Sequence, residues 1–378
     1  MDKPHPSPHG KLDSNSELPL ELTDVNTAWF KKIFDLKIKE VSTTQIIPGT
    51  ATKVLVQITY EENYDESIAP KSVCVKGGFD PALRALSLNV IYRREAEFFY
   101  HLAPQLAMQL PKPWYCGSDL ASGQGIVVLS DLVAANCTFG ECTEAWPVER
   151  IRSGLDQLAI LHAKTWGATE AEYSWIKEEF SMRDVIVSLF APSEWDKRFL
   201  GDAKPPVADY LVDRERMFAG FKTMWKLENP KYKAVVHGDS HIGNTYILPN
   251  GELAFLDWQG VHISSVFHDV AYFISGSLSI EDRRAHERDL VGHYLEMLHK
   301  SGAPEFTVDE VWVEYRKHML HGFAWALAGP LMQTKERVDI MSERHSTAIV
   351  DHKSLELLEA LQKEAKGEEP TLIGTRTS

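Results

Sequence analysis

The segment that most constrains this chain is His237–Asn244, which reads His-Gly-Asp-Ser-His-Ile-Gly-Asn and follows the short apolar run Ala234–Val236. A second acid, Asp257, ends another apolar run further along. In the pattern H-x-D-x-x-x-x-N with a later strand-end Asp, the first carboxylate accepts or orients a hydroxyl proton. The amide oxygen and the second carboxylate hold Mg²⁺ on nucleotide phosphates. The sequence therefore predicts phosphoryl transfer from a nucleotide, with Asp239 as the catalytic residue and Asn244 and Asp257 as metal ligands.

Other interpretations of the same residues stay open at this stage. Asp239 and Asp257 could each form an ordinary Asx turn at a strand end. His237, Asp239 and His241 could instead surround one metal ion in a hydrolase. The chain could also be a pseudokinase, a module that binds nucleotide without turnover. We expect His237 to brace the loop through hydrogen bonds rather than to carry protons.

Two upstream residues fit the same chemistry. Val73–Lys76 has the form V-x-V-K, in which the lysine of a third strand contacts the α- and β-phosphates. A surface lysine at a strand end is the alternative. The following helix supplies Glu95, which would hold that lysine in place. Glu97 competes with it, but lies about 200° around the helix, so only one of the two can face inward. We predict Glu95.

Three further segments carry weaker signals. The Gly49–Thr50 turn between two predicted strands could cover phosphates with backbone N–H groups, although a plain hairpin turn explains it equally well. Asp269 opens an expected helix near 266–273, and it could cap that helix or hold the loop at Asp239 from behind. A short helix near 23–30 is expected to have Thr23 or Asp24 as its cap.

Composition and charge exclude several classes of protein. The net charge of −14 disfavours nucleic acid as a partner. The sequence contains no run of about 18 apolar residues, so it predicts no membrane span. The 4 cysteines form no C-x-x-C pair, which favours reduced thiols in a cytoplasmic protein. No sequence feature fixes an oligomeric state.

The order of predicted elements indicates an α+β fold with two lobes. Strand patterns dominate the first third, and helical patterns dominate the remainder except near 234–257. We predict four regions: a disordered N-terminal segment at 1–19, a β-rich N-lobe that binds nucleotide phosphates at 20–132, a mainly helical C-lobe with the catalytic loop, metal and acceptor sites at 133–365, and a loose tail at 366–378.

On the segments His237–Asn244, Leu256–Gln259 and His268–Phe273, with support from Glu95 and Leu158–Ala163, the chain resembles the aminoglycoside phosphotransferase/choline kinase-like superfamily. Its ecdysteroid kinase-like branch is the most similar. The resemblance covers roughly residues 40 to 330. No A-P-E segment follows Asp257, which makes a protein substrate improbable.

The resemblance implies a bilobal protein-kinase-like fold. It also implies ATP (or GTP) as donor, Mg²⁺, and a hydroxyl of a small molecule as acceptor. Lys76 would contact phosphate, and the backbone near Ser130 and Leu132 would hold the adenine. A single glycine in the phosphate loop leaves the choice of donor open.

Overall fold

The computed structural model describes residues 12, 17–85, 89–176, 182–201, 204–330 and 332–367. Most of the predicted disordered segment at 1–19 and of the predicted tail at 366–378 lies outside these residues. Within them, no helix is both long and apolar enough to cross a membrane.

The N-terminal part is built on one antiparallel sheet with strand order β1-β2-β3-β5-β4. Its strands are β1 (Ile38–Ile47), β2 (Thr52–Tyr60), β3 (Ser72–Gly77), β4 (Pro113–Asp119) and β5 (Gln124–Ser130). Side chains alternate along β2, so Val54, Val56 and Ile58 share one face while Lys53 lies on the other. The strand patterns predicted for the first third of the chain are confirmed, whereas β4 was not predicted.

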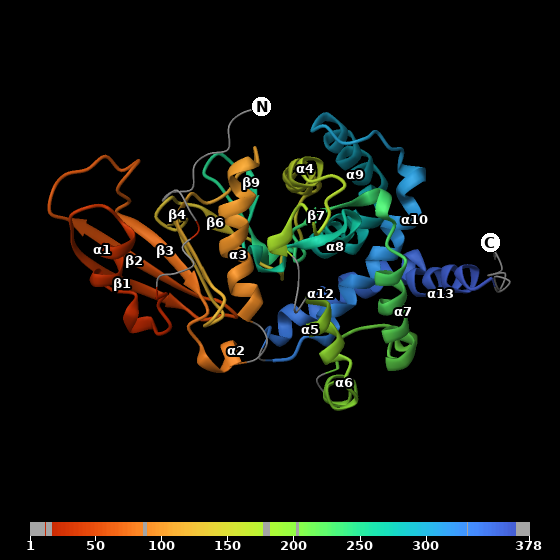
Figure 1. Cartoon of the computed structure of the whole chain (residues 1–378). Helices are drawn as coiled ribbons and strands as arrows, with labels where there is room; N and C mark the ends of the chain where they lie inside the picture. Colours follow the sequence, from red (N-terminus) through yellow and green to blue (C-terminus); the bar gives the residue numbers. More distant parts are fainter. Residues whose placement is uncertain are drawn as a thin grey trace.

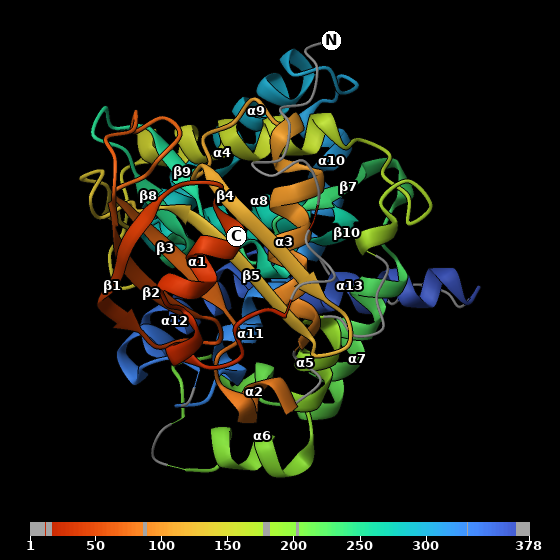
Figure 2. The same cartoon turned by 60° about the vertical axis from the view of Figure 1, so that its left-hand side comes forward.

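Helices cover both faces of this sheet, as Figures 1 and 2 show. On one face, α1 (Thr27–Ile33) buries Trp29 and Phe30 against the apolar side chains of β2 and β3. Its N-cap is Asn26, whose side chain accepts hydrogen bonds from the first turn, so the prediction of Thr23 or Asp24 was wrong. On the other face, α3 (Asn89–His101) separates the sheet from the helical part; α2 (Pro81–Ala85) precedes it.

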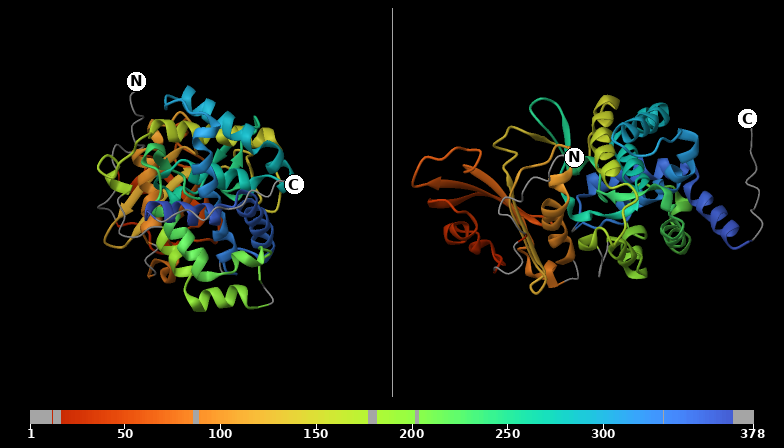
Figure 3. Two further views of the ribbon diagram at one scale, coloured as in Figure 1. Left: turned by 90° about the vertical axis from the view of Figure 1, so that its right-hand side faces the viewer. Right: turned by 45° about the horizontal axis from the view of Figure 1, so that its top comes forward.

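The remaining chain is mainly helical, and the right-hand view of Figure 3 shows the sheet at one end of the molecule and α13 at the other. Its helices are α4 (Val148–Lys164), α5 (Met182–Leu189), α6 (Pro192–Phe199), α7 (Arg214–Lys226), α8 (Phe267–Ser277), α9 (Ile280–Lys300), α10 (Val308–His318), α11 (Ala324–Leu327), α12 (Lys335–His352) and α13 (Ser354–Ala365). The main hydrophobic core lies among these helices and includes Phe98 and Phe99 of α3.

Short strands carry the predicted catalytic segments between the two parts. Strand β7 (Lys233–Val236) pairs with β10 (His262–Ser265), and β8 (Thr245–Ile247) lies between β6 (Thr138–Phe139) and β9 (Leu253–Phe255). The first predicted acid follows β7 and the second follows β9. The loop after β7 leads into β8, and β8 pairs with β9, so both acids lie in one region of the molecule although they are separated in sequence.

Candidate active site

The loop that follows β7 is held from behind by one buried carboxylate. Asp269, in the first turn of α8, accepts the backbone N–H of His237 at 2.6 Å and that of Gly238 at 3.0 Å. It also accepts the Ser240 hydroxyl at 3.2 Å and His162 Nε2 at 3.1 Å. Burial works to raise the pKa of Asp269, but the hydrogen bond and charge of His162 outweigh it and lower that pKa. Of the two roles considered for Asp269, the geometry favours holding the loop.

His237 and Gly238 fix the entry to this loop. His237 Nε2 donates to the carbonyl of Leu256 at 3.0 Å, and its Nδ1 accepts the N–H of Asp239 at 3.2 Å. Both ring nitrogens are therefore engaged in bracing. Gly238 has φ +83°, and a Cβ there would lie 2.1 Å from the carbonyl oxygen of Gly260. Only glycine permits this approach of the two loops.

Asp239 is oriented by three side chains around it. Asn244 Nδ2 donates to the backbone oxygen and to Oδ2 of Asp239, each at 2.9 Å. The Tyr272 hydroxyl donates to Oδ1 at 3.4 Å, and His241 Nε2 lies 3.6 Å from Oδ2. Burial works to raise the pKa of Asp239, yet His241 and His237 lower it, so the carboxylate is ionised at neutral pH.

Lys76 occupies a buried ion-pair network. Its Nζ lies 2.7 Å from Glu95 Oε2 and 2.9 Å from Asp257 Oδ1. Burial favours the neutral amine, but Asp257 and Glu95 outweigh it and raise the pKa of Lys76. Glu97 instead accepts the Ser118 hydroxyl at 2.7 Å. The predicted partner of the lysine is thus Glu95 and not Glu97.

Asp257 lies at a strained turn that α3 supports. Its φ of +67° is in the left-handed region, which few non-glycine residues adopt. The N–H of Trp258 donates to Glu95 Oε1 at 3.1 Å, and the Trp258 ring stacks on Phe98 at a centroid distance of 4.1 Å. Glu95 therefore links Lys76 of the sheet to the loop that carries Asp257.

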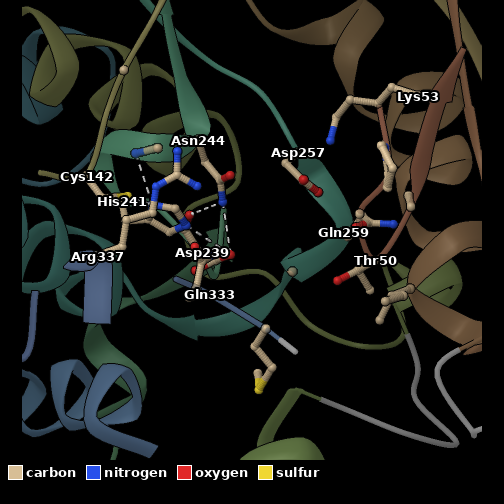
Figure 4. A pocket seen from close by; sticks show the side chains of 18 residues that line it. Thr50, Lys53, Cys142, Asp239, His241, Asn244, Asp257, Gln259, Gln333 and Arg337 are labelled. Carbon is tan, nitrogen blue, oxygen red and sulfur yellow. Dashed lines mark hydrogen bonds and ion pairs between the residues drawn. The ribbon is translucent and has the colours of Figure 1, made fainter. Parts of the chain in front are cut away.

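A cavity of about 360 Å³ is lined by residues of both the N-terminal sheet and the helical part, and Figure 4 shows the side chains that line it. Of the predicted site residues, it is lined by Gly49, Thr50, Asp239, Asn244 and Asp257. The others lie outside its lining: Lys76 and Glu95, which are buried beside it, and Ser130 and Leu132 at the end of β5 and beyond.

Several lining residues were not predicted as site residues. Lys53 comes from β2, Cys142 follows β6, and Gln333 and Arg337 come from the start of α12 and the loop before it. Arg337 Nε lies 2.8 Å from an oxygen of Glu141. No local motif marks these positions, because only the fold brings them to the cavity.

The donor set fits a hard cation such as Mg²⁺. The Asn244 amide nitrogen faces Asp239, which leaves the amide oxygen available, and the ion pair of Asp257 with Lys76 is made through Oδ1. Phosphate and water oxygens commonly supply the remaining ligands of Mg²⁺. Among the described residues, no group of three or more His, Cys, Asp and Glu side chains is placed to hold a metal ion.

Solved structures share this architecture. The amicoumacin kinase hAmiN, in complex with AMP-PNP, Ca²⁺ and Ami, has 13% identity and a TM-score of 0.52, covering 87% of this chain and 97% of that one. APH(2")-IIia, in complex with GDP and kanamycin, has 13% identity and a TM-score of 0.50, covering 86% and 98%. The choline kinase LicA from Streptococcus pneumoniae has 16% identity and a TM-score of 0.47, covering 86% and 98%. The first two confirm the bilobal kinase-like fold.

Sequence comparison gives the family. No curated protein matches the chain significantly. Residues 51–303, more than half of the chain, match the family described as ecdysteroid kinase-like. This range includes the Lys76–Glu95 pair and both loops that carry Asp239 and Asp257. The chain therefore belongs to the ecdysteroid kinase-like family.

Proposed function

We propose that the protein transfers the γ-phosphate of ATP, or of GTP, to a hydroxyl group of a small molecule, with Mg²⁺ as the required cation. One observation carries this proposal: Asp239, Asn244 and Asp257 line the same cavity, beside the buried pair of Lys76 with Glu95. These are the groups that phosphoryl transfer needs, and each has a partner that fixes its position. We also propose that the boundary between the N-lobe and the C-lobe lies near residue 132.

The chemistry of the chain's own residues follows from their geometry. Asp239 accepts the proton of the acceptor hydroxyl, whose oxygen bonds to the γ-phosphorus while the bond to the bridging oxygen of the nucleoside diphosphate breaks. Asn244 holds the Asp239 carboxylate. Together with Asp257 it would provide oxygen ligands for Mg²⁺, which would supply positive charge to the phosphates when bound. Lys76, kept charged by Glu95, adds a fixed positive charge beside them.

Membership of the family is also compatible with a nucleotide-binding pseudokinase. An assay that needs no acceptor distinguishes an active kinase from a pseudokinase. Water can replace the acceptor hydroxyl, so an active kinase site hydrolyses its nucleotide slowly. We expect Mg²⁺-dependent hydrolysis of ATP or GTP by the wild type. In Asp239→Asn it should fall on the order of 10²–10⁴-fold. Asp289→Asn is the control, because Asp289 is exposed on α9. Nucleotide binding with equal hydrolysis in wild type and Asp239→Asn would contradict the proposed catalytic role.

The nature of the donor is tested in the same assay. The structures of hAmiN and APH(2")-IIia hold AMP-PNP and GDP, respectively, so both adenine and guanine nucleotides are reasonable candidates. Acceptors can then be sought among hydroxylated small molecules by mass spectrometry, as products that carry one added phosphoryl group.

A further inference from the structure

Lys53 is a positively charged residue of the cavity that no motif in the sequence marks. It lies on β2, directly opposite Lys76 on β3 in the antiparallel register. Residues paired in this way point to the same face of a sheet, and like charges there destabilise the pair. Two ammonium groups on one face therefore need counterions of their own.

The carboxylate groups near the cavity are unequally distributed among its positively charged side chains. Lys76 has both Glu95 and Asp257 as partners. Arg337, a further cation of the lining, is paired with Glu141. His241, also in the lining, has Asp239 as its carboxylate partner. Among the described residues, Lys53 Nζ has no carboxylate within 4.0 Å and donates no hydrogen bond. Of the described lysine and arginine side chains that line the cavity, Lys53 is therefore the one without a carboxylate within 4.0 Å, although its charge acts over a longer distance to lower the pKa of Asp257.

The position of Lys53 shows where an anion would bind. The side chain reaches from the sheet toward Asp257 in Figure 4, across the cavity from Asp239 and Asn244. Its Nζ lies 4.0 Å from the place that a Cβ on Gly49 would occupy. The ammonium group is therefore beside the Gly49–Thr50 turn, and the Thr50 carbonyl accepts the Tyr92 hydroxyl at 2.9 Å, which fixes this turn to α3.

We propose that Lys53 binds the phosphate chain of the nucleotide directly, as a second cation next to Lys76. This inference rests on the proposed function. A triphosphate that lies between the Gly49–Thr50 turn and the oxygens of Asn244 and Asp257 passes the Lys53 ammonium group. Lys76 is enclosed by two carboxylates and is absent from the cavity lining. Lys53 therefore offers the more accessible charge, and Lys76 fixes Asp257.

Binding measurements on Lys53→Met and Lys53→Arg test the proposal. Affinities for ATP and adenosine, or for GTP and guanosine if the wild type prefers GTP, are measured by calorimetry with Mg²⁺. A lost hydrogen bond between charged groups predicts a roughly ten- to hundred-fold weaker triphosphate affinity in Lys53→Met. Nucleoside affinity should stay within about two-fold, because nucleosides carry no phosphate. Lys53→Arg keeps the charge and should recover part of the loss.

The control is Lys39→Met, which removes an exposed lysine from β1 of the same sheet. It corrects for the general effect of one lost positive charge. Melting curves of all variants, compared with the wild type, establish that each is folded. A triphosphate affinity in Lys53→Met equal to that of Lys39→Met overturns the assignment of Lys53, as does an equal loss for triphosphate and nucleoside. A wild type that binds neither triphosphate instead overturns the proposed function itself.

Discussion

The substitution Asp269→Asn tests how strongly the loop at Asp239 depends on one buried side chain. Asp269 accepts two backbone N–H groups of that loop, together with His162 and Ser240. Asparagine keeps the shape but replaces one oxygen with an NH₂ group. At least one donor then faces another donor, and the remaining hydrogen bonds lose their charged acceptor.

The cost can be worked from these contacts. An unsatisfied buried donor costs ~1–3 kcal/mol, and hydrogen bonds to a charged group contribute ~1.5–3 kcal/mol each. We therefore expect Asp269→Asn to lower the free energy of unfolding by about 4 kcal/mol. At roughly 2.1 cal/mol/K per residue, a chain of 378 residues has an unfolding entropy of about 0.8 kcal/mol/K. The melting temperature should fall by about 5 °C.

The assay is thermal unfolding of Asp269→Asn beside Asp289→Asn, since exposed substitutions usually change stability by less than ~0.5 kcal/mol. Nucleotide hydrolysis should also fall, because a loosened loop no longer holds Asp239 in place. Melting of Asp269→Asn within about 1 °C of the control would refute the reasoning that Asp269 holds the loop.

Three further predictions follow from other contacts. Glu95→Gln should lower nucleotide hydrolysis about 10²-fold by misplacing Lys76, whereas Glu97→Gln should not; equal losses would contradict the pairing. Burial lowers the pKa of His345 to about 3, below its unfolded value of about 6.5. Stability is therefore lost as pH falls from 6.5, by about 2 kcal/mol at pH 5. In urea unfolding at pH 7.5 and 5, His345→Asn should show a smaller pH dependence than the wild type, and an unchanged dependence would refute this. Phe98→Ala removes a ring stacked on Trp258 and should cost ~3–5 kcal/mol in denaturant unfolding; a loss below about 1 kcal/mol would contradict its role in the core.

Local patterns explain what could be predicted from the sequence. The strand that ends near Lys76, the helix that carries Glu95 and the loop at Asp239 each lie within a short segment with a characteristic spacing. Such segments place functional groups relative to one element. The bilobal fold followed from the order of elements, and the similarity to hAmiN confirms it.

Long-range contacts explain what could not be predicted. The sequence offered two roles for Asp269, and only the packing of α8 behind the loop separates them. Lys53 looks like any lysine of an alternating strand, and the role proposed for it depends on the register with Lys76. Arg337 reaches the cavity from a helix near the end of the chain. Strand β10 carries too few apolar residues to signal its pairing with β7.

The most direct test of the proposed kinase site is nucleotide-induced thermal stabilisation of the wild type and of Asp257→Asn. ATP and GTP are each added with and without Mg²⁺. At a nucleotide concentration of about 100 times Kd, binding stabilises by ~2.7 kcal/mol, which corresponds to about 3 °C here. We expect a Mg²⁺-dependent rise with at least one nucleotide and its loss in Asp257→Asn. The absence of any rise in the wild type, or an equal rise in the variant, would contradict the site described.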